Sequence, residues 1–205
     1  MIGILDYGVG NVGAYLRIFH NENIPVMPIS SASDFSVVDK IILPGVGAFD
    51  SAMTKLNGSG LRDVLDEMVL QQSKPILAVC IGMHMLGRDS EEGSMSGLGY
   101  IEGSTKKMPS ASKGKVLMLP HMGWNEIDFV RDDDIWTGVN IKEGFYFLHS
   151  YAFSPDAKDS IIGSSLYGRN FTCAVRSSNV YGFQFHPEKS LSNGLRLLRN
   201  FAESP

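Results

Sequence analysis

The sequence has few of the residues that build disulfide or metal frameworks. Its 205 residues include two cysteines, Cys80 and Cys173, which form no CxxC pair. The five histidines stand singly along the chain, whereas a structural zinc site needs grouped cysteines or histidines. Disulfide scaffolds belong to much smaller secreted domains. We therefore expect neither a metal site nor a disulfide.

Positive charge and long apolar runs are also scarce. The formal net charge is −4, which provides no electrostatic footprint for nucleic acid. The longest nearly apolar stretch, residues 75–86, is too short to span a bilayer and contains His84. Residues 1–6 lack the basic start of a secretory signal peptide. These absences predict a soluble cytoplasmic protein that binds neither nucleic acid nor membrane.

The first half of the chain alternates short apolar runs with helical spacing. Residues 2–5, 25–29, 40–43 and 75–79 have the branched, non-alternating composition of buried strands. Apolar residues at helical spacing lie between them, as at Val12, Tyr15, Leu16 and Phe19 and again from Leu61 to Val69. This order predicts an α/β fold with a mostly parallel central sheet flanked by helices.

The second half predicts more strands and less helix. Strands are expected at residues 116–119, 145–148, 172–176 and 180–185, with a short one at 98–101 inside a loop, and a last helix around 195–201. No linker, repeat or low-complexity tract interrupts the chain. We therefore expect a single domain over residues 1–205, parallel at first and with an additional antiparallel region later.

A glycine-rich turn follows the first predicted strand. Gly8, Gly10 and Gly13 match the G-x-G-x-x-G pattern of dinucleotide-binding loops. The acid expected at the end of the second strand is missing, since that strand ends at Ile29 and Asp34 comes later, in a loop. A tight strand-to-helix turn is therefore the favoured interpretation, and a phosphate-binding loop is the alternative.

Cys80 stands between a buried strand and a predicted helix. Residues 78–82 form the cysteine version of a nucleophile elbow, a sharp turn that lifts the side chain out of the sheet. A thiolate at a helix N-terminus is favoured by the helix dipole. A small buried core cysteine is the alternative, because most free cysteines are of that kind.

His186 and Glu188 follow the last predicted strand. Pro187 ends that strand, and the carboxyl ends of parallel strands are where α/β proteins place their sites. A thiol, an imidazole and a carboxylate that orients the imidazole together make an activated nucleophile. We therefore predict that Cys80, His186 and Glu188 form a catalytic triad.

The turn at residues 44–47 suits the same chemistry. Two glycines flank Val46, so a peptide N–H near Val46 or Gly47 can point into the crevice. Together with the N–H of Ile81, it would hold the oxyanion of a tetrahedral intermediate. A simple turn is the alternative.

At this point the motifs resemble a known family. Three segments look like the signatures of class I glutamine amidotransferases: Pro44-Gly45-Val46-Gly47, Cys80-Ile81-Gly82-Met83 and Phe183-Gln184-Phe185-His186-Pro187-Glu188. Three more resemble the glutaminase subunits of imidazole glycerol phosphate synthase: residues 6–11, 120–125 and 149–151. The match runs nearly end to end, in the family's order and spacing.

The resemblance implies a reaction and further site residues. It implies hydrolysis of L-glutamine to glutamate and ammonia with no cofactor, and substrate contacts from His84, Ser150 and Tyr151. Two positions depart from the family pattern, because family members usually have Gly where Ala78 stands and Gln where His84 stands. The second departure bears on how the substrate is held.

The resemblance also implies a partner. Ammonia would pass to a (β/α)8-barrel cyclase in a heterodimer, and the glycine-rich loop would face that synthase subunit and bind no dinucleotide. Residues at family positions that face the synthase are Asn11, Met122, Trp124, Asn125 and Lys189. Trp124 is expected in a loop, where a large aromatic is often an interface anchor.

Three other functions stay open at the level of sequence. A paralogous amidotransferase would supply ammonia for amidino groups of surface-polysaccharide sugars. A binding subunit would have lost glutaminase activity through the change at His84. A nucleotide-binding oxidoreductase is the weakest alternative, because it leaves Cys80, His186 and Glu188 without a role.

Overall fold

The central element of the fold is a mixed sheet of eight strands. A computed structural model describes residues 1–112 and 114–204. Across the sheet the strands run in the order β10 (Asp128–Phe129), β13 (Ile161–Tyr167), β14 (Arg169–Ser177), β15 (Val180–Phe183), β4 (Ile76–Cys80), β3 (Lys40–Gly45), β1 (Ile2–Leu5) and β2 (Val26–Ile29).

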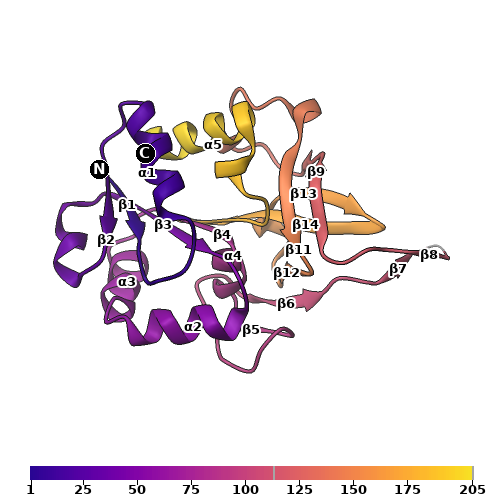
Figure 1. Cartoon of the computed structure of the whole chain (residues 1–205), viewed down its shortest axis with the longest axis horizontal. Helices are drawn as coiled ribbons and strands as arrows, with labels where there is room; N and C mark the ends of the chain where they lie inside the picture. The colour runs from indigo at the N-terminus through magenta and orange to yellow at the C-terminus, as the bar shows by residue number, and fades with distance from the viewer. Residues whose placement is uncertain (113, 205) are drawn as a thin grey trace.

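The helices flank the parallel part of this sheet. Figure 1 shows α1 and α5 on one side of the parallel strands and α2 and α3 on the other. No helix among the described residues is long and apolar enough to cross a membrane. The helices are α1 (Val12–Asn21), α2 (Phe49–Gly58), α3 (Arg62–Asp66), α4 (Ile81–Met85) and α5 (Leu191–Glu203), with a π-helical turn η2 (Glu67–Gln71) and 3-10 turns η1 (Ala32–Val37), η3 (Asp134–Trp136), η4 (Ile141–Glu143), η5 (Lys158–Ser160) and η6 (Pro187–Lys189).

The order of parallel and antiparallel pairing follows the prediction. Strands β15, β4, β3, β1 and β2 pair in parallel, and every residue of β1, β3 and β4 is buried. This explains why these strands lack a polar alternation. Strands β13, β14 and β15 pair antiparallel. The expected α/β class, parallel first and antiparallel later, is confirmed.

Three small sheets complete the second half of the chain. They pair β9 (His121–Asn125) with β11 (Phe145–His149), β12 (Tyr151–Pro155) with β6 (Gly103–Lys107) and β5 (Asp89–Ser90), and β7 (Ala111–Ser112) with β8 (Lys115–Val116). Figure 1 shows the β7 and β8 strands extending away from the body of the molecule at its right edge.

The predicted strand at residues 98–101 is wrong. Leu98, Tyr100 and Ile101 are buried, but the N–H groups of Leu98 and Ile101 donate to the carbonyls of Met85 and Leu86 at 2.7 and 3.1 Å. They therefore cover the end of α4 instead of joining a ladder. The nearby strand is β6, whose sequence Gly-Ser-Thr-Lys-Lys has no apolar alternation to reveal it.

The predicted strand at residues 116–119 is mostly wrong as well. Only Val116 belongs to a strand, at the end of β8. Val116 and Met118 are 82% and 74% exposed, so their apolar character does not mark a core strand. Asp34 was expected in a loop, but it lies in the 3-10 turn η1, where its carboxylate accepts the N–H of Ser31 at 2.8 Å.

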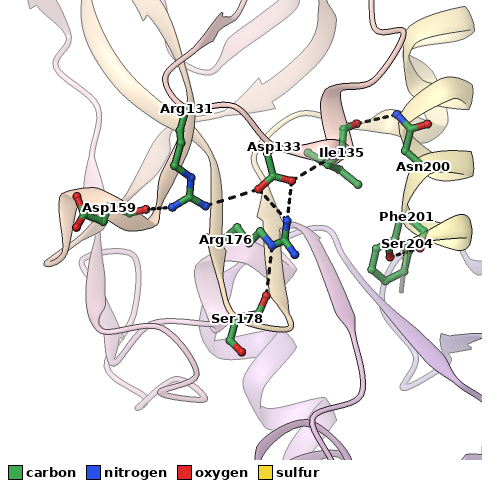
Figure 2. Close-up of polar contacts among 9 residues, drawn as sticks. All are labelled: Arg131, Asp133, Ile135, Asp159, Arg176, Ser178, Asn200, Phe201 and Ser204. Atoms are coloured by element: carbon green, nitrogen blue, oxygen red, sulfur yellow. Dashed lines mark hydrogen bonds and ion pairs between the residues drawn. The ribbon is translucent and has the colours of Figure 1, made fainter.

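A buried carboxylate ties the antiparallel edge of the sheet to the preceding turn. The Asp133 side chain is 2% exposed and accepts two hydrogen bonds of 2.9 Å from Nη1 of Arg176 on β14. It also caps η3 through the N–H of Ile135 at 3.2 Å and lies 3.6 Å from Arg131. Figure 2 shows both arginines converging on this one carboxylate. The cluster holds β14 against η3.

We expect the substitution Asp133→Asn to destabilise the fold. It removes a charge-assisted acceptor from Arg176, and a hydrogen bond to a charged group contributes about 1.5–3 kcal/mol. Denaturant unfolding should show a loss of that size, with no loss in Asp132→Asn, whose side chain is exposed. Equal stability of the two variants would contradict this role of Asp133.

Candidate active site

Cys80 occupies the turn between β4 and α4. Its backbone has φ of +56° and ψ of −110°, a left-handed conformation that costs about 1–3 kcal/mol for a residue with a side chain. Such strain is typical of nucleophile elbows, which present one side chain at the carboxyl end of a strand. The predicted elbow is therefore present, and Cys80 is 4% exposed within it.

Two glycines make the elbow sterically possible. A Cβ on Gly82 would lie 2.3 Å from the carbonyl oxygen of Leu43, and a Cβ on Gly45 would lie 2.4 Å from the nitrogen of Gly82. The start of α4 therefore packs directly on the backbone of β3. Ala78 is fully buried and pairs in register with Leu43 and Gly182 on the neighbouring strands.

His186 and Glu188 leave the sheet just beyond β15. The imidazole Nδ1 of His186 lies 2.8 Å from Oε1 of Glu188, and both side chains are nearly buried, at 4% and 3% exposure. Cys80 and His186 line the same cavity, and the interaction between them raises the pKa of the imidazole. The structure thus brings the three predicted catalytic residues together.

The electrostatics of this cluster favour an ion pair. Burial lowers the pKa of His186, but hydrogen bonds and charge from Cys80 and Glu188 outweigh burial and raise it to about 10. Burial raises the pKa of Glu188, while its hydrogen bond to His186 and the imidazolium charge bring it below the ordinary value. At neutral pH the imidazole is therefore protonated beside Cys80 and Glu188. A protonated imidazole can donate its proton to a leaving group.

Tyr15 is a site residue that the sequence analysis used only as a core position. Its hydroxyl on α1 donates to Oε2 of Glu188 at 2.9 Å, and the side chain is 1% exposed. Burial first and the Glu188 charge second raise its pKa well above the ordinary value, so it stays a donor. Glu188 is thus held from both oxygens, by His186 and by Tyr15.

Removing the Tyr15 hydroxyl should slow the reaction with little effect on substrate affinity. In Tyr15→Phe one hydrogen bond to a carboxylate is lost, about 1.5 kcal/mol, which corresponds to about a tenfold lower kcat for glutamine hydrolysis. KM should change little, because Tyr15 does not line the cavity described next. The matched control is Tyr181→Phe on β15, a buried tyrosine away from Glu188. An unchanged kcat in Tyr15→Phe would contradict the role.

A cavity of 310 Å³ opens beside Cys80. Its lining includes every predicted oxyanion and substrate residue, together with side chains that the sequence analysis did not single out. Glu92 is one of these, and burial raises the pKa of its carboxyl group. A larger cavity of 480 Å³ lies around Phe153 and Phe171 and contains none of the predicted site residues. The residues lining the cavity at Cys80 are Val46, Gly47, Cys80, Ile81, His84, Glu92, Pro120, Leu148, His149, Ser150, Tyr151, His186 and Lys189.

His84 lines this cavity and already has a partner inside the protein. Its Nε2 lies 2.8 Å from Oε1 of Gln184, a fully buried residue at the end of β15. Burial, the largest effect, lowers the pKa of His84 to about 4. The imidazole is therefore neutral, and one of its two nitrogens is already engaged inside the protein.

The predicted interface residues lie on two neighbouring elements and at the start of α1. Met122 and Trp124 are 66% and 49% exposed on β9. The Trp124 and Tyr146 rings pack edge to face, with their centroids 6.4 Å apart. Nζ of Lys189 lies 5.6 Å from the centre of the Tyr146 ring. These side chains thus share one surface beside the cavity. Asn11 caps α1 by accepting the N–H of Ala14.

One detail of this surface corrects the expectation. Trp124 lies in strand β9 and not in a loop, and the apolar Met122 and Trp124 alternate on the exposed face of that strand. Asn125 uses its amide internally, donating to the carbonyl of Leu166 at 3.0 Å. The side-chain oxygen Oδ1 of Asn125 accepts the N–H of Glu126 at 2.9 Å.

The glycine-rich loop has a steric explanation. Gly8 and Gly10 have φ of +81° and +95°, and a Cβ on Gly10 would lie 2.6 Å from Pro44. Gly13 has nothing within 4 Å of a Cβ position. The first two glycines therefore serve the turn and its packing on the oxyanion segment, whereas the third is not needed for close helix packing.

The geometry matches a family of known chemistry. The family model described as "Glutamine amidotransferase class-I" matches residues 4–204. The chain belongs to the class I glutamine amidotransferase family. Among the described residues, no three His, Cys, Asp or Glu side chains are grouped so as to hold a metal ion.

Curated amidotransferases resemble this one over nearly their whole length. The chain is 46% identical over 202 residues to "Imidazole glycerol phosphate synthase subunit HisH" of Leptospira interrogans, covering 98% of this chain and 99% of that one. It is 43% identical to the subunit of the same name from Bdellovibrio bacteriovorus, covering 99% and 100%. It is 44% identical to "subunit HisH 2" of Pseudomonas aeruginosa, covering 99% of each.

Solved structures support the amidotransferase fold. A crystal structure of a glutamine amidotransferase superposes with a TM-score of 0.73 at 17% identity, over 98% of this chain and 97% of that one. The PurLQS structure from Thermotoga maritima gives a TM-score of 0.71 at 14% identity, over 98% and 96%. At these identities the likeness concerns the fold alone.

Proposed function

We propose that this chain is the glutaminase subunit of an imidazole glycerol phosphate synthase and acts in histidine biosynthesis. It hydrolyses L-glutamine to glutamate and ammonia. The observation that carries this proposal is the cluster of Cys80, His186 and Glu188 at one cavity, in a chain 46% identical to a HisH subunit. The cavity suits a small amino acid rather than a nucleotide or a polymer.

The reaction follows from the placement of the three side chains. The Cys80 thiolate attacks the side-chain carbonyl carbon of glutamine, and N–H groups near Val46, Gly47 and Ile81 stabilise the oxyanion. His186 protonates the amide nitrogen as the C–N bond breaks, releasing ammonia and leaving a thioester. His186 then takes a proton from water, which attacks the thioester carbon. Glutamate leaves and the thiolate is restored.

Substrate recognition uses the walls of the same cavity. Ser150 and Tyr151 follow β11 and form one wall. Glu92 is another residue of the cavity lining, and its carboxylate offers a partner of opposite charge for the α-ammonium group of glutamine. His84 lines the cavity, but its Nδ1 is buried and its Nε2 contacts Gln184.

The proposal includes a partner and a location. The names of the curated relatives describe a subunit, and the exposed Met122 and Trp124 lie on β9, which pairs with β11, the strand whose Leu148 and His149 line the cavity. We assign this surface to a cyclase subunit of (β/α)8-barrel type in a heterodimer, which takes up the ammonia. The cytoplasm is the proposed compartment, in line with the scarcity of cysteine.

Genetic complementation tests the proposed function. A bacterial strain that lacks its own HisH subunit should grow without histidine when it expresses this chain with its cognate barrel subunit. Ammonium must be limiting, because free ammonia could replace the product of the glutaminase. The Cys80→Ala variant is the control and should not support growth. Failure of the unaltered chain to restore growth would contradict the proposal.

A further inference from the structure

Gln184 is a buried carboxamide next to the nucleophile. It is fully buried just after β15, and its backbone N–H donates to the carbonyl of Cys173 at 2.9 Å. Its side chain bridges two site residues, with Oε1 2.8 Å from Nε2 of His84 and Nε2 3.9 Å from Sγ of Cys80. The mechanism above assigns it no task, although a buried amide needs partners at both ends.

The protonation of His84 determines which end of the amide faces the sulfur. His84 is neutral, because burial lowers its pKa to about 4, so only one ring nitrogen carries a hydrogen. Nδ1 is buried, and no residue that the structure describes gives it a hydrogen-bond partner. A hydrogen on Nδ1 would leave a buried N–H unpaired, and in the observed orientation it would also set the Nε2 lone pair against Oε1 of Gln184. The hydrogen therefore lies on Nε2 and is donated to Gln184.

This tautomer sets the direction of the whole contact. Because Oε1 of Gln184 accepts from His84, the NH₂ end of the amide must point toward Cys80. Apart from the His186 imidazole, which interacts with Cys80, the sulfur contacts the carbonyl of Leu148 at 3.8 Å. That carbonyl is an acceptor that a thiol S–H can satisfy but a thiolate cannot. The Gln184 N–H is a donor that favours the charged form of the sulfur.

We propose that Gln184 is a positioning residue for Cys80, and that its amide, oriented by His84, stabilises the attacking thiolate. The inference rests on the proposed function, since it concerns how the nucleophile is prepared. It also gives His84 a role at the position where the family usually has Gln. His84 then acts through Gln184 and not by direct contact with the reacting atoms.

The test measures alkylation of Cys80 by iodoacetamide as a function of pH, with the modified peptide identified by mass spectrometry. Gln184→Met keeps the length of the side chain and removes its donor. We expect its alkylation profile to move up by about one pH unit and the rate near pH 7 to fall about tenfold. Met83→Leu is the matched control, a volume-conserving change at a buried neighbour on α4, and should leave the profile in place.

His84 variants separate an indirect role from a direct one. His84→Leu should shift the alkylation profile in the same direction as Gln184→Met. His84→Gln keeps a donor for Gln184 and should leave the profile where it is in the unaltered chain. The double variant His84→Leu/Gln184→Met should be no slower than Gln184→Met alone, because both changes remove one coupled contact. Additive shifts would overturn the proposal. If Gln184→Met does not fold, as judged by thermal melting, the two His84 variants carry the test.

Turnover gives a second readout. With glutamine and the barrel partner, Gln184→Met should lower kcat about tenfold and leave KM nearly unchanged, since Gln184 does not line the cavity. An alkylation profile identical to that of the unaltered chain would reject the inference. Absence of glutamine hydrolysis in the unaltered chain would instead reject the proposed function, while the alkylation comparison would still be readable.

Discussion

Replacement of Cys80 by alanine should abolish glutamine hydrolysis, with a fall of at least about 10³-fold in kcat. The reason is chemical: without the sulfur no thioester can form, and His186 and Glu188 have no nucleophile to activate. The measurement is steady-state glutamate release with the barrel partner present. A glutamine-derived chloroketone or diazoketone should label the same residue, located by mass spectrometry.

Cys173 supplies the internal control for this prediction. It lies in β14, is fully buried, and burial raises its pKa far above the ordinary value, so it remains an inert thiol. Cys173→Ala should therefore retain activity and labelling. Labelling chiefly at Cys173, or full activity in Cys80→Ala, would remove Cys80 as the nucleophile.

Addition of the barrel partner should raise the glutaminase rate by at least about 10²–10³-fold, the contribution of one oxyanion donor. The physical reason is the segment at the end of β3, in which Val46 is 46% exposed and Gly47 has φ of +92°. We predict that in the free subunit the Gly45–Val46 peptide presents its carbonyl to the cavity, and that docking turns its N–H inward. Glutamate release with and without the partner and its ligand measures the effect. Equal rates would reject the switch.

Trp124 should be an anchor of that complex. The exposed Trp124 ring packs edge-on against Tyr146, and the Lys189 ammonium lies over the Tyr146 ring. Aromatic residues buried at the centre of an interface often contribute about 2 kcal/mol or more to the binding free energy. Trp124→Ala should therefore weaken partner affinity at least about 30-fold. Leu70→Ala is the control, since Leu70 is 60% exposed in η2, which adjoins α3 and not β9. Unchanged affinity in Trp124→Ala would exclude it as an anchor.

Much of the site was predictable because its signals are local. The elbow at Cys80, the His-Pro-Glu corner and the Pro-Gly-Val-Gly turn each occupy a few consecutive residues at the end of a buried strand. A parallel sheet brings the ends of its strands to one edge, so motifs far apart in the chain meet there.

Other elements left no local signal. Strand β6 is polar although it lies between β12 and β5 in a small sheet, and Val116 is apolar but exposed in a hairpin. In β9 the two apolar side chains, Met122 and Trp124, alternate on the exposed face of the strand, so their spacing does not mark a buried face. In each case a period-two apolar pattern was the only cue available, and the cue requires one face of the strand to be buried.

The sequence by itself determined the fold class and the family and predicted Cys80 as the nucleophile, because buried strands and the turns that follow them are formed by residues that lie next to one another in the chain. Only the tertiary structure decided which side chains support that nucleophile. Tyr15 reaches Glu188 from α1, 173 residues away, and His84 contacts Gln184 across 100 residues. Such contacts depend on how helices pack against the ends of strands. Burial then decides which group donates each hydrogen bond, and no local pattern of the sequence reveals this burial.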